Sequence, residues 1–134
     1  MLKLYNPKDC VTTINDTIAL TGYSTSMIAC SKDNPLVSIV EGAQGDAVGN
    51  VSNSKLGTMT ITLQATSPSN AVMMKLAKNR EIFSIWCNDK SLGERAGGSE
   101  AIIETYPNFD KADVAGDRVY TIKIADYDVI MTNE

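Results

Sequence analysis

The chain has 134 residues, 43% of them apolar, and a formal net charge of −4 from 12 basic and 16 acidic side chains. This length suffices for one domain with its own core and is short for two ordinary domains. The negative net charge and the scattered lysines and arginines argue against tight binding of DNA or RNA. The sequence has no histidine, which excludes Ser-His and Cys-His catalysis as well as His-ligated zinc.

The location of the chain is predicted from its apolar runs and its cysteines. No apolar run approaches the roughly 18–20 residues of a membrane helix, and the stretch after Lys3 lacks the apolar region of a signal peptide. Cys10, Cys30 and Cys87 are far apart and form no C-x-x-C pair. An odd number of cysteines without a secretion signal predicts reduced thiols in a protein that folds in a cytoplasm.

The first strands are predicted from short alternating runs. Residues 11–14 and 17–20 flank Asn15-Asp16, a good two-residue turn, and together they predict a β-hairpin. Two further strands are expected at 26–31 and 36–41, separated by a polar turn that contains a proline. The N-terminal third is therefore predicted to be all β.

The next segment, 41–56, is rich in Gly, Asn and Ser. It predicts either a long loop or a weak hairpin around 47–51, and loops of this length in small domains are usually functional or disordered. Its oxygen-bearing side chains Glu41, Asp46 and Asn50 do not have the spacing of a calcium loop. Its glycines are not followed by the Gly-Lys-Ser/Thr of a phosphate-binding loop. We therefore expect neither a metal nor a cofactor here.

A strand with strict two-residue alternation follows. Met59, Ile61 and Leu63 point to one side, and the side chains on the other side are short and mostly hydroxylated: Thr58, Thr60, Thr62 and Gln64. The first set is expected to face the core.

A short helix is predicted at about 68–79. Ser67 suits the N-cap, and Pro68 occupies a position where its missing N–H costs nothing. The apolar residues share one face of this helix, while the basic ones lie toward its C-terminal end, where the helix dipole favours cations. The apolar set is Val72, Met73, Leu76 and Ala77, and the basic set is Lys75, Lys78 and Arg80.

The C-terminal part is predicted to contain a buried strand at 82–87, a polar loop at 88–99, a strand at 101–106 and one long strand at 118–131. Asp126 and Asp128 stand two apart, and are interpreted as solvated charges rather than a catalytic pair. The prediction is a mainly β protein, sandwich-like or barrel-like, forming a single domain over 1–134. No constellation of acid and base residues indicates an enzyme.

Three segments together resemble the tail tube proteins of contractile-tailed, myovirus-type bacteriophages. They are VSIVEGAQGDAVGNVSNSKLG at 37–57, TMTITLQATSPSNAVMMKLAKN at 58–79, and GDRVYTIKIADYDVIM at 116–131. The order and spacing of these segments carry the resemblance. The first 25 residues and the segment 88–99 depart from it.

The resemblance implies a tail tube subunit with one flanking helix. Six copies would form a ring, and rings would stack into a tube around a channel through which genomic DNA passes without specific binding. The expected partners are other copies of the chain, the tail sheath protein, and the baseplate and tail terminator proteins, with no membrane. The protein would be assembled in the host cytoplasm and located in the virion tail.

The resemblance also suggests two surfaces. The channel-lining candidates are Thr58, Thr60 and Thr62, and the candidates for a ring-to-ring loop are Gly42, Gln44, Asp46, Asn50 and Asn53. Two alternatives stay open: the tube of a phage-like bacteriocin or secretion machine, which differs in what passes through it, and a β-sandwich module that binds a sugar or small ligand.

Overall fold

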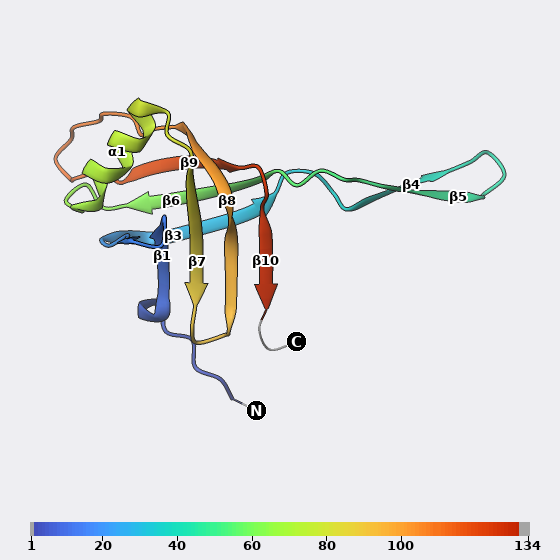
Figure 1. Cartoon of the computed structure of the whole chain (residues 1–134), viewed down its shortest axis with the longest axis horizontal. Helices are drawn as coiled ribbons and strands as arrows, with labels where there is room; N and C mark the ends of the chain where they lie inside the picture. Colours follow the sequence, from blue (N-terminus) through green and yellow to red (C-terminus); the bar gives the residue numbers. More distant parts are fainter. Residues whose placement is uncertain (1, 132–134) are drawn as a thin grey trace.

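The computed structural model describes residues 2–131. It is mainly β with a single α-helix, which confirms the predicted fold class (Figure 1). The elements in chain order are a 3-10 turn (Pro7–Asp9), β1 (Cys10–Ile14), β2 (Ile18–Ala19), β3 (Tyr23–Lys32), β4 (Val37–Glu41), β5 (Ala47–Val51), β6 (Gly57–Leu63), α1 (Ser69–Asn79), β7 (Phe83–Asp89), β8 (Glu94–Thr105), β9 (Arg118–Ile124) and β10 (Asp128–Met131).

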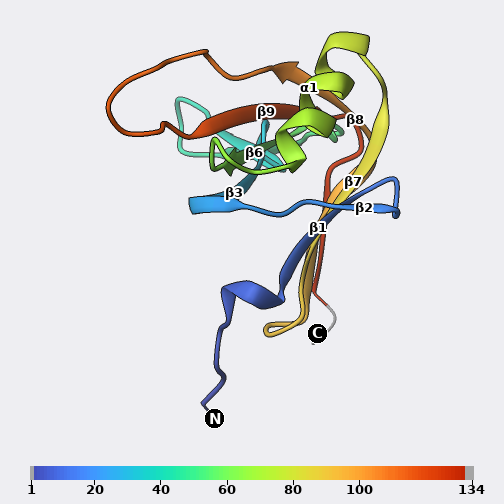
Figure 2. The ribbon, with the colours of Figure 1, turned by 90° about the vertical axis from the view of Figure 1, so that its left-hand side faces the viewer.

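Eight strands form one antiparallel sheet in the order β2-β1-β7-β8-β9-β6-β3, with β10 paired to β8 off this path. The sheet bends, so that β3, β6 and β9 form one layer and β1 and β7 run steeply across it (Figure 2). The apolar core fills the space inside the bend, and α1 contributes Met73 and Leu76 to it. β4 and β5 form a separate two-stranded sheet.

The alternation predicted for β6 is confirmed. Met59, Ile61 and Leu63 are fully buried, and each such side chain contributes roughly 1.5–3 kcal/mol by leaving water. β6 pairs with β3 on one side and β9 on the other, and it therefore lies in the middle of its layer.

The predicted helix is also confirmed, with a different start. It begins at Ser69, and Pro68 rather than Ser67 is the N-cap residue. Ser67 still stabilises the start of the helix, because its Oγ accepts a hydrogen bond from the Ser69 N–H at 3.2 Å and donates one to the Thr21 carbonyl. At the other end Arg80 takes a left-handed conformation, with φ of 51°, and ends the helix.

The polar loop predicted at 88–99 is wrong. β7 continues to Asp89, a short turn follows, and β8 begins at Glu94. Charged and glycine residues weaken a strand signal in the sequence, yet here the strand is imposed by pairing with both β7 and β10. Gly97, with φ of 148°, fits where a Cβ would overlap the carbonyl of Ile85.

The single long strand predicted at 118–131 is wrong as well. It breaks at Ala125–Tyr127, and β10 leaves β9 to pair with the first half of β8. Asp126 sits in this break, and its carboxylate accepts the Ser99 and Glu100 N–H groups at 3.0 Å. It is therefore a structural acceptor and not a merely solvated charge.

Candidate assembly surfaces

The most prominent surface is a hairpin of β4 and β5 that projects from the body, which we call the arm (Figure 1). The strands pair in register from Val37 opposite Val51 to Glu41 opposite Ala47. Every residue of both strands is exposed. The segment 41–56 is thus not a long loop throughout. Residues 47–51, around which a weak hairpin was the alternative, are the second strand of a hairpin whose first strand is 37–41.

The predicted ring-to-ring residues lie at three different places along the arm: at its tip, on its strands and near the body. Gly42, Gln44 and Asp46 belong to the tip, where the Gly42 N–H bonds the Asp46 carbonyl at 2.7 Å and closes the turn. Asn50 lies on the shaft opposite Ser38, and exposed Asn53 follows β5 near the body. The structure therefore gathers only the first three in one place.

The base of the arm is fastened to the body by hydrogen bonds. Lys32 Nζ donates to the Ser54 carbonyl, and Asn34 Nδ2 donates to Ser54 Oγ at 2.9 Å. The Asp33 N–H bonds the Leu56 carbonyl at 3.0 Å. These contacts hold the two chain segments together where they leave the sheet.

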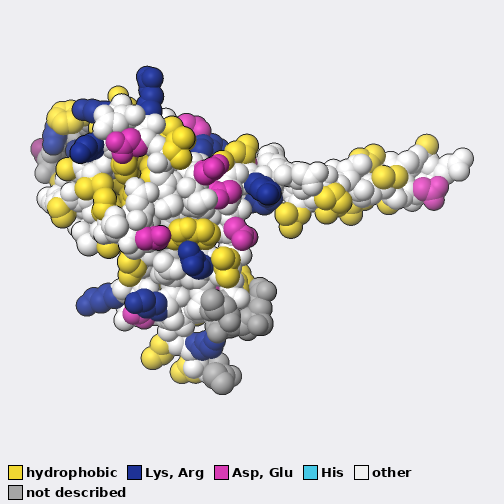
Figure 3. Space-filling view, in the orientation of Figure 1, with side chains coloured by type: hydrophobic (Ala, Val, Ile, Leu, Met, Phe, Trp, Pro, Cys, Tyr) yellow, Lys and Arg dark blue, Asp and Glu magenta, His cyan; other side chains and the backbone are white. Residues whose placement is uncertain are grey.

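The arm exposes apolar side chains along its length (Figure 3). They are Leu36, Val37, Ile39, Val40, Val48 and Val51. The most exposed are Ile39 at 74% and Val51 at 77%. A two-stranded hairpin in water is only marginally stable, and a row of exposed apolar side chains marks an interaction surface.

The second surface is the outer face of the β3-β6-β9 layer. Thr58 lies opposite Lys123, Thr60 opposite Thr121, and Thr62 opposite Val119. Thr58 and Thr60 are half-buried, whereas Thr62 is buried at 8% exposure. The three residues share one face of β6, but only two of them offer side chains to solvent.

Charge on this face is locally balanced. Lys123 Nζ lies 2.9 Å from Asp33 Oδ2 and 2.8 Å from Thr58 Oγ1, and the Thr58 hydroxyl donates to Asp33. Hydrogen bonds from Thr58 and then Lys123 lower the pKa of Asp33, and the hydrogen bond to Asp33 raises the pKa of Lys123. Both groups stay charged at neutral pH and offset each other. Local sequence patterns could not reveal this ion pair, because its two partners are 90 residues apart in the chain.

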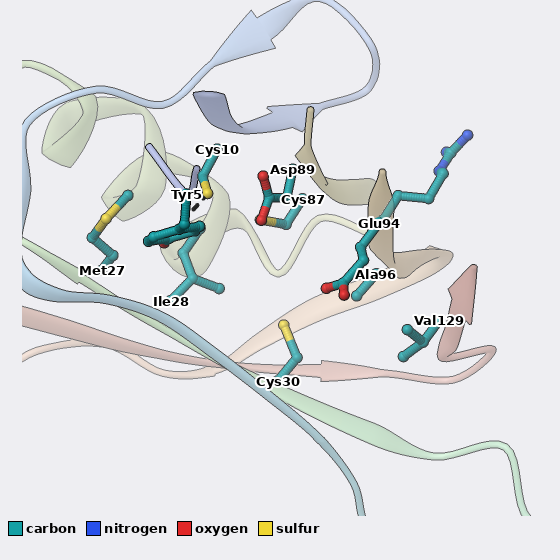
Figure 4. Close-up of a pocket in the computed structure, with 11 residues that line it drawn as sticks. Tyr5, Cys10, Met27, Ile28, Cys30, Cys87, Asp89, Glu94, Ala96 and Val129 are labelled. Atoms are coloured by element: carbon teal, nitrogen blue, oxygen red, sulfur yellow. Dashed lines mark hydrogen bonds between the residues drawn. The ribbon is translucent and has the colours of Figure 1, made fainter. Parts of the chain in front are cut away.

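The three cysteines converge on one pocket of about 190 Å³ between β1, β3, β7 and β8 (Figure 4). All three are free thiols. The Tyr5 hydroxyl lies 3.6 Å from Cys10 Sγ. Burial raises the pKa of Cys30 to about 11 and also raises the pKa of Cys87. These two thiols are therefore protonated at neutral pH, and the protonated form reacts slowly.

Metal binding and membrane crossing would each require a particular structural feature within residues 2–131. That part of the chain contains no group of three His, Cys, Asp or Glu side chains placed to hold a metal ion. Its one α-helix is neither long nor apolar enough to cross a membrane.

The fold is that of chains in contractile injection systems. One lies in the sheath–tube complex of an extracellular contractile injection system (PVC) in its extended state, with a TM-score of 0.66, 11% identity, and coverage of 96% of this chain and 93% of that one. Another lies in the tube-terminating cap of the anti-feeding prophage, with a TM-score of 0.64, 12% identity and coverage of 98% and 94%.

A third similar chain lies in the PVC sheath/tube terminator, with a TM-score of 0.64, 13% identity, and coverage of 93% of this chain and 95% of that one. No protein-family model and no curated protein matches the sequence. At these identities the likeness establishes the fold.

Proposed function

We propose that this chain is the structural subunit of a phage tail tube, in which hexameric rings stack around a channel for DNA. The observation that carries the proposal is the agreement of fold with chains of contractile injection systems over nearly the full length of both partners. An isolated binding module has no need for a long exposed arm, whereas a subunit that polymerises does.

Ring formation is supported by an open sheet edge. β3 is ten residues long and ends the eight-stranded sheet, so that its outer backbone groups have no strand partner within the described residues. Such edges invite pairing with another chain. Pairing of this edge with a different edge of the next copy is a heterologous contact, which closes into a ring when the rotation allows it.

We assign the contact between stacked rings to the arm. Its exposed apolar side chains would be covered by a subunit of the neighbouring ring, which removes them from water and stabilises the marginal hairpin. In this arrangement Gly42, Gln44 and Asp46 at the tip make the most distant contact.

The channel surface is assigned to the outer face of β6, through Thr58 and Thr60, while Thr62 on the same face is buried. Short neutral side chains and a balanced ion pair neither neutralise phosphates nor release counterions, so that DNA can slide without adhering. The negative net charge of each subunit acts in the same direction. The proposed partners are the sheath, baseplate and terminator proteins, and the proposed location is the virion tail, after assembly in the host cytoplasm.

Negative-stain electron microscopy of concentrated purified protein tests the proposal directly. We expect tubes or six-fold rings. Uniform monomers at all concentrations, together with saturable binding of a sugar or small molecule, would contradict it and support the ligand-binding alternative.

The tube of a phage-like bacteriocin or secretion machine differs from this proposal only in its cargo. Nucleic-acid staining of particles purified with the protein, after nuclease treatment of the exterior, separates the two. Protected DNA supports the phage tail. Particles that contract but never contain DNA support the alternative.

A further inference from the structure

The loop 106–117 between β8 and β9 has no described role in the core. Apart from half-buried Pro107, its residues are exposed, including Phe109 at 82% and Val114 at 80%. It has three aspartates, Asp110, Asp113 and Asp117, against one lysine. Asp117 is held by the Ser24 hydroxyl at 2.7 Å, so Asp110 and Asp113 are the acids still available to a partner.

The exposed side of α1 has the opposite charge. Lys75 and Lys78 lie three residues apart and are both exposed, as is Ala71 one turn earlier. The helix contains no acidic residue. Within residues 2–131 the only ion pair is Lys123–Asp33, so neither lysine is committed to a carboxylate of its own chain.

The start of the loop, 106–109, lines a pocket with Asn70 and Met74 of α1 in the same chain, and the rest of the loop extends away from the helix (Figure 2). Both the loop and the helix are at the end of the body opposite the arm (Figure 1). Viewed along the long axis, the loop extends beyond the body on the left, while α1 lies over the right part of the body (Figure 2). A contact between the patches of two copies would join them laterally, at one level along the arm direction.

We infer that the acidic loop 106–117 of one copy docks on the basic face of α1 of the next copy in the ring, with Asp110 and Asp113 facing Lys75 and Lys78 and Val114 near Ala71. The contact joins two different surfaces, which is the kind that builds a ring from identical subunits. Its charges fix the partner and the orientation more than they add affinity. This inference rests on the proposed ring assembly.

Charge reversal on each side and on both sides tests the contact. Lys75→Glu with Lys78→Glu, and separately Asp110→Lys with Asp113→Lys, are each expected to lower the sedimenting polymer by about tenfold or more, because like charges then oppose each other. Combining all four substitutions should recover most of the polymer. Circular dichroism should show a folded subunit in every case, since all four side chains are exposed.

A matched control separates specific pairing from net charge. The helix pair Lys75→Glu and Lys78→Glu is combined with Glu100→Lys and Asp128→Lys, two exposed acids of β8 and β10, which restores the native net charge of −4 without restoring the pairing. We expect no recovery of polymer.

The outcomes separate this inference from the proposed function. If the wild-type chain polymerises and both reversed pairs polymerise equally well, the loop–helix contact is wrong and the tube proposal stands. If they polymerise but lose only the binding of an enclosing sheath protein, the acidic partner of α1 is that protein and not a second copy. A wild-type chain that stays monomeric at high concentration overturns both.

Discussion

The carboxylate of Asp126 holds the point where β9 ends and β10 begins. It accepts hydrogen bonds from the Ser99 hydroxyl, from the Ser99 N–H at 3.0 Å, and from the Glu100 N–H at 3.0 Å. The hydrogen bond of the Ser99 hydroxyl is the main reason that the pKa of Asp126 is lowered. One side chain thereby fixes the point where the chain passes from pairing with the second half of β8 to pairing with its first half.

Asp126→Ala should reduce the free energy of unfolding by about 2 kcal/mol, the usual value of hydrogen bonds to a charged group. Because the folded pKa is lowered, this stabilisation is present above the unfolded value of about 3.9 and is lost as pH falls through the folded pKa. Denaturant unfolding of both proteins should show their difference shrinking below about pH 4. A difference that is independent of pH would contradict the role of the ionised carboxylate.

A charged substitution should have opposite effects at two neighbouring positions of β6, preventing folding at one and leaving the protein folded at the other. Ile61 is fully buried, and Ile61→Asp should prevent folding because it places an unpaired carboxylate in the core. Thr60 faces outward, and Thr60→Lys should change the free energy of unfolding by less than about 1 kcal/mol. Circular dichroism and urea unfolding measure both. A folded Ile61→Asp protein would mean that the register of β6 is wrong.

Cys30 should be the slowly alkylated thiol. With a pKa of about 11, it is almost entirely protonated at pH 8, and the thiolate is the species that reacts. Its rate of modification by iodoacetamide should rise about tenfold per pH unit between pH 8 and 10. Mass spectrometry of the labelled peptides follows it. Full labelling within minutes at pH 7 would contradict the burial of this side chain.

At the scale of single elements, the arm should be separable from the body. No residue of β4 or β5 is buried, and the Ser52 N–H bonds the Leu36 carbonyl at 2.8 Å where the two segments meet. Replacing 37–51 with a short Gly-Ser turn should therefore leave the melting temperature of the monomer within a few degrees of wild type. It should abolish tube formation, because the proposed stacking contact is gone.

Light scattering and negative-stain microscopy measure that result. Gln44→Ala at the arm tip is a suitable mild control, because it keeps the hairpin and removes only one side chain. If the armless protein polymerises normally, the arm has no part in stacking.

Local patterns predicted some elements well and others poorly. β6 and α1 were predictable because alternation, a proline at the start and an apolar helix face all lie within one segment. The turn at Asn15 and Asp16, both with positive φ, was predictable for the same reason. β8 was not, because its glycines and charges become a strand only through partners that come from distant parts of the chain.

The residues of the candidate sites were likewise predictable where a local pattern determines them and unpredictable where tertiary contacts do. The facing of Thr58 and Thr60 came from alternation, whereas the burial of Thr62 and the ion pair of Lys123 with Asp33 depend on tertiary contacts. The convergence of three distant cysteines on one pocket left no local trace in the sequence either. Composition indicated that 41–56 was unusual, but it could not distinguish a flexible loop from an exposed hairpin.

At the scale of the whole molecule, the channel assignment can be tested in particles. Thr60→Lys adds one positive charge per subunit on the proposed channel face and should slow or arrest DNA ejection while tubes still form, because the lysines bind phosphates. Thr13→Lys is the matched control, since Thr13 is equally half-buried but belongs to β1 in the other layer. Ejection assays compare the two. Equal ejection in both would place the channel on another face.

The arm leaves the body at one end only (Figure 1). A stack of such subunits is therefore polar: one terminal ring presents free arms, and the other presents the vacant surfaces that arms would fill. The two ends are chemically different, so a single capping protein cannot close both. In the proposed tube, the proteins at its two ends would therefore have to recognise complementary rather than identical surfaces.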